Sequence, residues 1–182
     1  MNQQAAHSMY YVAVLCPPEI DKKILEYKRW MKERFGCVVA LKSPAHITLI
    51  PPFWLEEEKE TILQHTCTSF ASELPELTIG IQGFSHFSKK VLYAVVTGNP
   101  AIEELKKQVE VHFVSSFDVI KKDERPFHPH ITIATRDLKP SDFIKAWDYF
   151  STKEFTTTFT TQTISLLKLI EGKWNVIKEK NW

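Results

Sequence analysis

The sequence predicts an α+β fold in which antiparallel sheet is covered by helices on its outer faces. Segments with the residue preferences of strands alternate with amphipathic helical segments, and several strands are joined by the short turns typical of hairpins. Long, regularly spaced parallel β-α-β units are not part of this pattern. Apolar residues make up 43% of the 182 residues and charged residues 25%, which is ordinary for a globular chain with a sizeable core.

The first half of the chain is predicted to hold two helices and two strand regions. A strand over residues 9–16 is followed by a helix over residues 17–36, where apolar residues recur every three or four positions. Two strand-rich pieces, separated by Ser43-Pro44, are expected within residues 38–53. A second helix is expected to begin in the acidic run at residue 56 and to stop at Pro75.

The second half repeats this alternation of strands and helices. Asn99 is the expected cap of a helix, because its side chain can accept from the first turn and Pro100 suits the first helical position. The other predicted elements are strands over residues 77–87 and 91–97, a strand over 130–134, a helix over 141–150, and a strand over 155–170 that forms a hairpin with residues 174–179.

The overall charge and the cysteines exclude some classes of protein. The formal net charge is only +1, which does not suggest non-specific coating of nucleic acid or membrane. The three cysteines are scattered, so neither a disulfide framework nor a thiolate zinc site is expected. The apolar run near the start is too short to cross a bilayer and lacks a basic leader. We therefore expect a cytoplasmic monomer without a membrane partner.

One four-residue pattern occurs twice. His46-Ile-Thr-Leu and His130-Ile-Thr-Ile both read histidine, apolar, threonine, apolar, and their histidines lie 84 positions apart (130 − 46), close to half the chain. In a strand, residues two apart point to the same face, so each histidine projects together with its threonine. The repeat predicts two related lobes facing each other within one domain of residues 1–182, with one motif per lobe near residues 46–49 and 130–133.

Two facing imidazoles suit acid–base chemistry on a phosphodiester. Near neutral pH one histidine can accept a proton while the other donates one. The hydroxyl groups of Thr48 and Thr132 can hydrogen-bond the non-bridging oxygens of the phosphate between them. His46 and His130 are therefore the candidate catalytic residues of a phosphodiesterase, and the scheme calls for no metal ion or cofactor.

Two other classes of function stay open at this point. The same cleft could bind RNA or a nucleotide without turnover, in which case removing one imidazole would change binding little. His128 shares its strand parity with His130, so a His-x-His pair of a metal-dependent hydrolase is geometrically possible. No third ligand stands at short spacing, however, and a role in orienting a neighbour is the alternative for His128.

The motifs carry a resemblance to a known family. "HITLIPPF" and "PFHPHITIATRDL" resemble the two-histidine (2H) phosphoesterase superfamily, in its branch of bacterial 2'-5' RNA ligase-like proteins, over essentially the whole chain. The resemblance implies a bilobal fold with a pseudo-twofold axis and a central cleft that holds both motifs. It also implies action on 2',3'-cyclic or 2'-5' linkages in RNA ends or nucleotides, by ligation or hydrolysis, without ATP or metal.

Further substrate contacts are expected beside the motifs. Many relatives carry an arginine soon after the second motif, and Arg136 is the candidate here, although a one-residue shift in a strand reverses the face it occupies. Several aromatic side chains near the motifs could stack on a base. Phe53 and Phe127 are the preferred candidates for this role, ahead of Tyr11 and Trp54, because they lie nearest the motifs.

Overall fold

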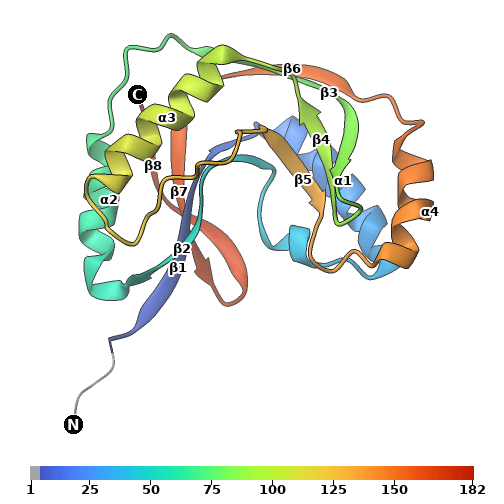
Figure 1. The fold of residues 1–182 in the computed structure, drawn as a ribbon, viewed down its shortest axis with the longest axis horizontal. Helices are drawn as coiled ribbons and strands as arrows, with labels where there is room; N and C mark the ends of the chain where they lie inside the picture. The colour runs from blue at the N-terminus through green and yellow to red at the C-terminus, as the bar shows by residue number, and fades with distance from the viewer. Residues whose placement is uncertain (1–4) are drawn as a thin grey trace.

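The computed structural model describes residues 5–182 and contains two four-stranded antiparallel sheets. The first sheet has the strand order β2-β1-β7-β8, and the second has the order β5-β4-β3-β6. Helices lie on the outside of both sheets, which face each other across the middle of the molecule (Figure 1). The predicted α+β fold with two lobes of antiparallel sheet is confirmed.

The chain begins and ends in the first sheet and forms the whole second sheet in between. The first sheet is built from β1 (His7–Leu15), β2 (His46–Glu56), β7 (Thr163–Ile170) and β8 (Lys173–Asn181). The second sheet is built from β3 (Leu77–Phe87), β4 (Val91–Val96), β5 (His130–Ala134) and β6 (Thr156–Thr161). Each sheet therefore contains strands from both halves of the chain.

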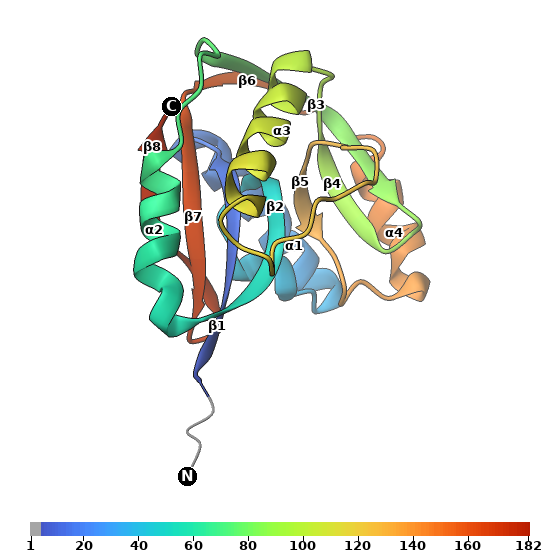
Figure 2. The same cartoon turned by 60° about the vertical axis from the view of Figure 1, so that its left-hand side comes forward.

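The helices cross between the lobes in the same way. They are α1 (Pro18–Phe35), α2 (Glu60–Ser69), α3 (Pro100–Val114) and α4 (Pro140–Phe150). The α1 helix follows a strand of the first sheet but packs against β5 of the second, whereas α3 follows a strand of the second sheet and packs against β2 of the first. Figure 2 shows α3 beside β2 and α2 along β7. The halves are interlocked.

The helix ends follow the expected chemistry. The Asn99 side chain accepts a hydrogen bond from the Ala101 N–H at 2.9 Å, as predicted for the cap of α3. Gly36 ends α1 in the left-handed region at φ 72°, where its N–H group bonds back to the last turn of the helix. These two signals place the beginning of α3 and the end of α1 correctly from sequence.

Three predicted elements differ from the structure. Residues Val39–Lys42 form a 3₁₀ turn, η1, instead of a strand, because the chain there packs against α1 and β5 and joins neither sheet. A short 3₁₀ turn, η2 (Glu57–Lys59), precedes α2, which ends at Ser69, six residues before Pro75. The long tail strand is two strands, since the chain leaves one sheet and enters the other at Gln162.

The core lies between the sheets' outer faces and the helices. Ile47 and Leu49 of the first motif and Ile131 of the second are fully buried in it, and Ile133 is 1% exposed. Their burial fixes the motif strands and, by the alternation of a strand, turns the histidines and threonines to the other face. A second, small cluster of Tyr11, Ala13 and Leu167 lies on that other face of the first sheet.

Candidate active site

The two motifs occupy equivalent positions in the two sheets. His46 begins β2 and His130 begins β5, and each of these strands is the edge of its sheet. In the first sheet Thr48 pairs with Ala13 of the central strand, and in the second Thr132 pairs with Tyr93. The β2 and β5 strands also lie in contact with each other. The fold thus brings the two motifs together across the cleft.

Both motif histidines make the same local hydrogen bond. The Nδ1 atom of His46 lies 2.8 Å from the carbonyl oxygen of Pro44, and the Nδ1 atom of His130 lies 2.7 Å from the carbonyl oxygen of His128. A backbone carbonyl can only accept, so each Nδ1 must carry a proton and donate it. In the neutral rings Nε2 is then the unprotonated nitrogen, able to take up a proton from a substrate.

Burial shifts the pKa of both imidazoles downward. Desolvation lowers the pKa of His46 to about 4, opposed by the Pro44 carbonyl, and positive charge at Lys28 adds to the lowering. Desolvation also lowers the pKa of His130, again opposed by its backbone hydrogen bond. Both rings remain partly open to the cleft. Near neutral pH the free protein therefore holds two neutral imidazoles ready to accept a proton.

Each histidine is also packed against a tyrosine of the neighbouring central strand. The rings of Tyr11 and His46 lie 4.9 Å apart, and the rings of Tyr93 and His130 lie 5.1 Å apart. Phe87 adds an edge contact to His130 at 5.0 Å. The Tyr11 hydroxyl makes no hydrogen bond within residues 5–182, and burial raises its pKa. Tyr11 of β1 and Tyr93 of β4 thus support the two rings from different registers, since Tyr93 lies opposite Thr132 whereas Ala13 lies opposite Thr48.

A cavity of about 230 Å³ joins the two motifs. It is lined on one side by His46 and Thr48 and on the other by Thr132 and Arg136. Tyr11 and Trp174 form part of its floor on the first sheet. We call it the threonine cavity, since the hydroxyl-bearing residues of both motifs line it. The cavity wall brings Arg136 to the motif residues, a placement that the sequence left open.

A second, larger cavity of about 610 Å³ lies on the His130 side. It shares Thr48 and Pro52 with the threonine cavity, and most of its wall is apolar. Phe87 and Phe127 contribute aromatic side chains, and Arg125 and Lys106 line the cavity as members of ion pairs with Asp123 and Glu110. We call it the Phe127 cavity. Its position next to His130 brings Phe127 to the site, where the sequence analysis expected it.

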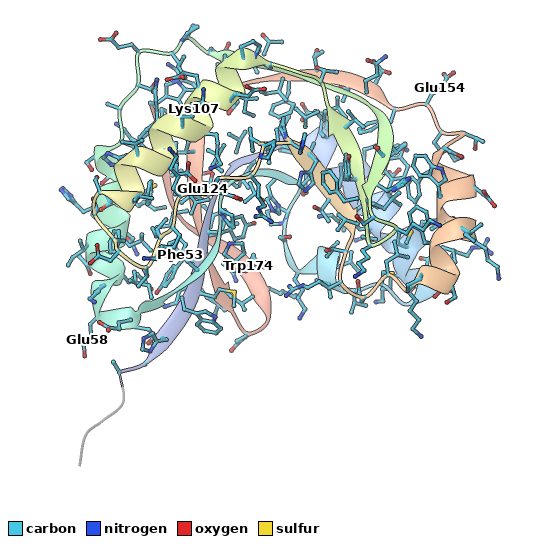
Figure 3. The ribbon with its side chains drawn as sticks, in the orientation of Figure 1. Phe53, Glu58, Lys107, Glu124, Glu154 and Trp174 are labelled. Carbon is cyan, nitrogen blue, oxygen red and sulfur yellow. The ribbon has the colours of Figure 1, made fainter. Side chains whose placement is uncertain are left out.

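Phe53 is not brought to the site, which corrects the expectation that it contacts substrate. Phe53 is 8% exposed, pairs with Tyr10 and belongs to the main core. Two register irregularities in β2 cancel each other, so Phe53 returns to the core face that also holds Ile47 and Leu49. Figure 3 shows Phe53 on the side of the sheet next to α2 and α3, and Trp174 nearer the opposite side.

Asp137 links the end of the second motif strand to the turn after α1. Its Oδ2 atom accepts hydrogen bonds from the N–H groups of Val38 at 2.6 Å and Val39 at 2.8 Å. These two N–H groups lie at the start of η1, which lines the threonine cavity through Val39 and Ala40. The contact fixes η1 against the segment that follows β5, next to Arg136.

The segment before each motif is anchored by polar residues of the preceding helix. Before the first motif, Lys28 of α1 donates to the Ser43 carbonyl at 2.9 Å, and Asp21 accepts from the Ala45 N–H at 2.6 Å. Before the second, Glu110 of α3 accepts from the Asp123 N–H at 2.8 Å and is paired with Lys106. These anchors fix the carbonyl groups that orient the histidines.

A metal-dependent hydrolase that used His128 and His130 would need further ligand side chains close to them. Residues 5–182 contain no group of three or more His, Cys, Asp or Glu side chains placed to hold a metal ion. His128 lines the Phe127 cavity, and its backbone carbonyl orients His130. His128 therefore orients His130 through its backbone carbonyl group.

Sequence reasoning missed several residues of the site. Tyr93, Phe87 and Trp174 lie far from the motifs in sequence, and no pattern near His46 or His130 points to them. Tyr93 stands 37 positions before His130, whereas Tyr11 stands 35 positions before His46. An alignment of the two halves of the chain on their motifs therefore leaves the two tyrosines two positions apart and would not have paired them.

Two interlocked lobes, each presenting a His-x-Thr strand to a shared cleft, define the fold of the two-histidine phosphoesterases. A family model described as the 2'-5' RNA ligase superfamily matches residues 16–173. The chain belongs to this family. A Geobacillus kaustophilus protein provisionally named a phosphoesterase is 29% identical over 171 residues, which cover 92% of this chain and 93% of that protein.

Solved structures share the fold at low sequence identity. Escherichia coli LigT in complex with 3'-AMP superposes with a TM-score of 0.65 at 17% identity, over 96% of this chain and 97% of LigT. The Thermus thermophilus protein TT0787 superposes with a TM-score of 0.64 at 16% identity, over 94% of this chain and 96% of that one. LigT has also been solved with ATP, at a TM-score of 0.66. No helix within residues 5–182 is long and apolar enough to span a membrane.

Proposed function

We propose that this protein is a phosphodiesterase that acts on 2',3'-cyclic or 2'-5' linkages of RNA ends or nucleotides. The observation that carries the proposal is the matched pair of Nδ1 hydrogen bonds, which leave the Nε2 atoms of His46 and His130 as the proton-transferring groups. Family membership and the nucleotide complexes of LigT support a nucleotide phosphodiester as substrate.

The proposed reaction is an in-line displacement at phosphorus. One imidazole takes a proton from water through Nε2 as the water oxygen bonds to phosphorus, and the other imidazole, protonated, gives its proton to the leaving ribose oxygen. Phosphorus thereby exchanges one oxygen for another, and the two histidines exchange protonation states. Ligation follows the same path with a ribose hydroxyl in place of water, and cleavage of the new linkage back to the cyclic phosphate is its reverse.

The threonine cavity suits the phosphate. The hydroxyl groups of Thr48 and Thr132 approach it from opposite lobes and can donate to the two non-bridging oxygens. Arg136, at the rim of the same cavity, can stabilise the charge that gathers on these oxygens in the transition state. In this arrangement each step of the proton transfer is performed by residues of the chain itself.

The Phe127 cavity suits the nucleoside on the His130 side of the phosphate. Its apolar wall with Phe87 and Phe127 can take a base by stacking. Because the cavity reaches Thr48 and His130, a base there would leave its phosphate between the motifs. Phe127 is thus proposed as a base-binding residue.

A panel of substrates tests the proposal. The panel holds 2',3'-cyclic nucleotides, ADP-ribose cyclic phosphate and 2'-5' linked oligonucleotides, and each is assayed with the unmodified protein, His46→Ala and His130→Ala. We expect each substitution to lower kcat by about 100-fold to 10,000-fold. His65→Ala, which removes an exposed imidazole on α2, is the matched control and should retain full activity.

Three results would contradict the proposal. Activity that survives both histidine substitutions would show that the imidazoles do not transfer protons. Loss of activity on addition of a chelator would favour the metal-dependent alternative. Tight nucleotide binding without turnover of any substrate would instead favour the non-catalytic binding protein.

A further inference from the structure

One face of the first sheet carries an apolar row, and three of its four members belong to neither the core nor the two cavities of the candidate site. The row runs straight across all four strands and consists of Trp54 on β2, Met9 on β1, Leu169 on β7 and Trp174 on β8. Met9 pairs with Trp54, and Leu169 pairs with Trp174. Tyr10 pairs with Lys168, which sets Met9 opposite Leu169. We call these four residues the tryptophan row.

The strand register puts this row on the cleft face of the sheet. Tyr11 lines the threonine cavity and pairs with Leu167. Met9 and Leu169 each lie two residues from that pair along their strands, so their side chains project from the same face. Directly paired residues also share a face, which brings Trp54 and Trp174 to the cleft side.

The row is open to solvent. Trp54 is 57% exposed, and the neighbouring Val176, which pairs with Leu167 on the same face, is 41% exposed. Met9, Leu169 and Trp174 are partly exposed. Helix α2 packs against β7 and β8 from the other side of the sheet, and the turn of the β7–β8 hairpin lies free at the lower edge in Figure 1. Two accessible tryptophans in one row are unusual for a surface without a ligand.

The row is continuous with the threonine cavity. Trp174 belongs to both, and its ring meets that of Tyr11 edge-on at 4.6 Å. Along β1, four residues separate Ala13, the partner of Thr48, from Met9 in the row. That separation corresponds to about 13 Å, and four strands give the row a width of about 14 Å. A chain that leaves the cavity away from His130 would therefore pass over the row.

We propose that the tryptophan row binds unpaired bases of an oligonucleotide substrate, beyond the reacting phosphodiester, where the threonine cavity ends at Trp174. The inference rests on the proposed function for its substrate class. Every base offers a flat face to an aromatic side chain, so such a row accepts single-stranded nucleic acid without reading its sequence. It follows that the preferred substrate is a strand several nucleotides long, rather than a single cyclic nucleotide.

The test compares a long and a short substrate of identical chemistry. We measure kcat/KM for a single-stranded RNA tetranucleotide that ends in a 2',3'-cyclic phosphate and for 2',3'-cyclic AMP, and take their ratio. The unmodified protein should prefer the tetranucleotide, and Trp54→Ala should lower the ratio about tenfold, with Trp54→Phe in between. Ile62→Ala is the matched control, since Ile62 on α2 is also 57% exposed, and it should leave the ratio unchanged.

A binding experiment separates this inference from the proposed function. A linear tetranucleotide is titrated into the His46→Ala/His130→Ala variant, and the quenching of tryptophan fluorescence is followed with and without Trp54→Phe. The tetranucleotide could quench the fluorescence and bind less tightly without Trp54 although no substrate is ever turned over. In that case the proposed function is wrong, and the tryptophan row is still a base-binding surface.

Two outcomes would overturn the row as a base-binding surface. In the first, both substrates are turned over, and the ratio of kcat/KM for the tetranucleotide to kcat/KM for 2',3'-cyclic AMP is the same in the unmodified protein and in Trp54→Ala. The second is a dimer, seen by analytical ultracentrifugation, that Trp54→Ala converts to monomer while the ratio stays the same. That result would assign the row to contact between two copies of the chain and would contradict the expected monomer.

Discussion

The Nζ atom of Lys28 donates a hydrogen bond to the backbone carbonyl of Ser43 at 2.9 Å, from a side chain that is buried in α1. Burial lowers the pKa of Lys28 to about 8, although Asp21 opposes the shift. A charged amine in this position holds the turn before His46 and also contributes to the low pKa of that imidazole. Stability and site chemistry are therefore linked through one lysine.

Lys28→Met should change how stability depends on pH. The folded-state pKa of about 8 lies below the unfolded value near 10.4, so between these pH values the folded state binds fewer protons and becomes more stable as pH rises. The free energy of unfolding of the unmodified protein should rise by about 3 kcal/mol over this pH range, and this rise should be absent from Lys28→Met. Urea unfolding at pH 7 to 10.5 measures it, and parallel curves for the two proteins would contradict the prediction.

The pH profile of kcat/KM should be bell-shaped and centred below pH 6.5. Burial lowers the pKa of both imidazoles, so the protonated ring that acts as acid is lost at lower pH than for a free histidine. Below a pH of about 4, the ring that acts as base is protonated as well. Bound phosphate favours imidazolium, which should move the kcat profile to higher pH. A kcat/KM that still rises above pH 8 would refute this assignment.

Much of this site follows from the alternation of residues in two strands. His46 with Thr48, and His130 with Thr132, turn to the cleft because Ile47, Leu49, Ile131 and Ile133 are buried on the other face. The same alternation of side chains predicts that Phe53 lies on the core face. The expectation that Phe53 contacts substrate was based on its closeness to the motif in sequence and did not take this alternation into account. Trp54, its neighbour, takes the exposed position.

What the sequence could not supply is contact between distant segments. Trp174 reaches the threonine cavity only because β7 leaves β6 at Gln162 and enters the other sheet. Asp137 finds the N–H groups of Val38 and Val39, which lie 98 or more positions away in the sequence. Local propensity carries no information about such partners, because they depend on how the two lobes interlock.

Removing either motif hydroxyl should impair the reaction. Thr48→Val and Thr132→Val keep the branched shape but lose the donor to a non-bridging oxygen. A hydrogen bond to a charged group is worth about 1.5–3 kcal/mol, so each change should lower kcat/KM by about 10-fold to 100-fold. Steady-state kinetics on a 2',3'-cyclic nucleotide measures the loss. Thr158→Val, at an exposed position of β6, is the control, and equal activity in all three variants would exclude the role.

Asp137→Ala should destabilise the protein. The change leaves two backbone N–H groups without their acceptor where η1 packs against β5. We expect the free energy of unfolding to fall by about 2–3 kcal/mol. Thermal unfolding followed by circular dichroism measures the effect, and Asp118→Ala, in the exposed turn after α3, is the control. An unchanged Tm would show that these hydrogen bonds do not contribute to the stability of the fold.

The exchange of strands between the lobes determines the order in which the chain can fold during synthesis. The β1 strand needs β7 as its neighbour, and β7 leaves the ribosome only after residues 163–170 are made. The first motif therefore emerges early but stays on an incomplete sheet while more than a hundred further residues are translated. Neither half of the chain can mature alone. The cleft closes only when the carboxyl-terminal hairpin arrives, and premature termination anywhere before it leaves both histidines without a working site.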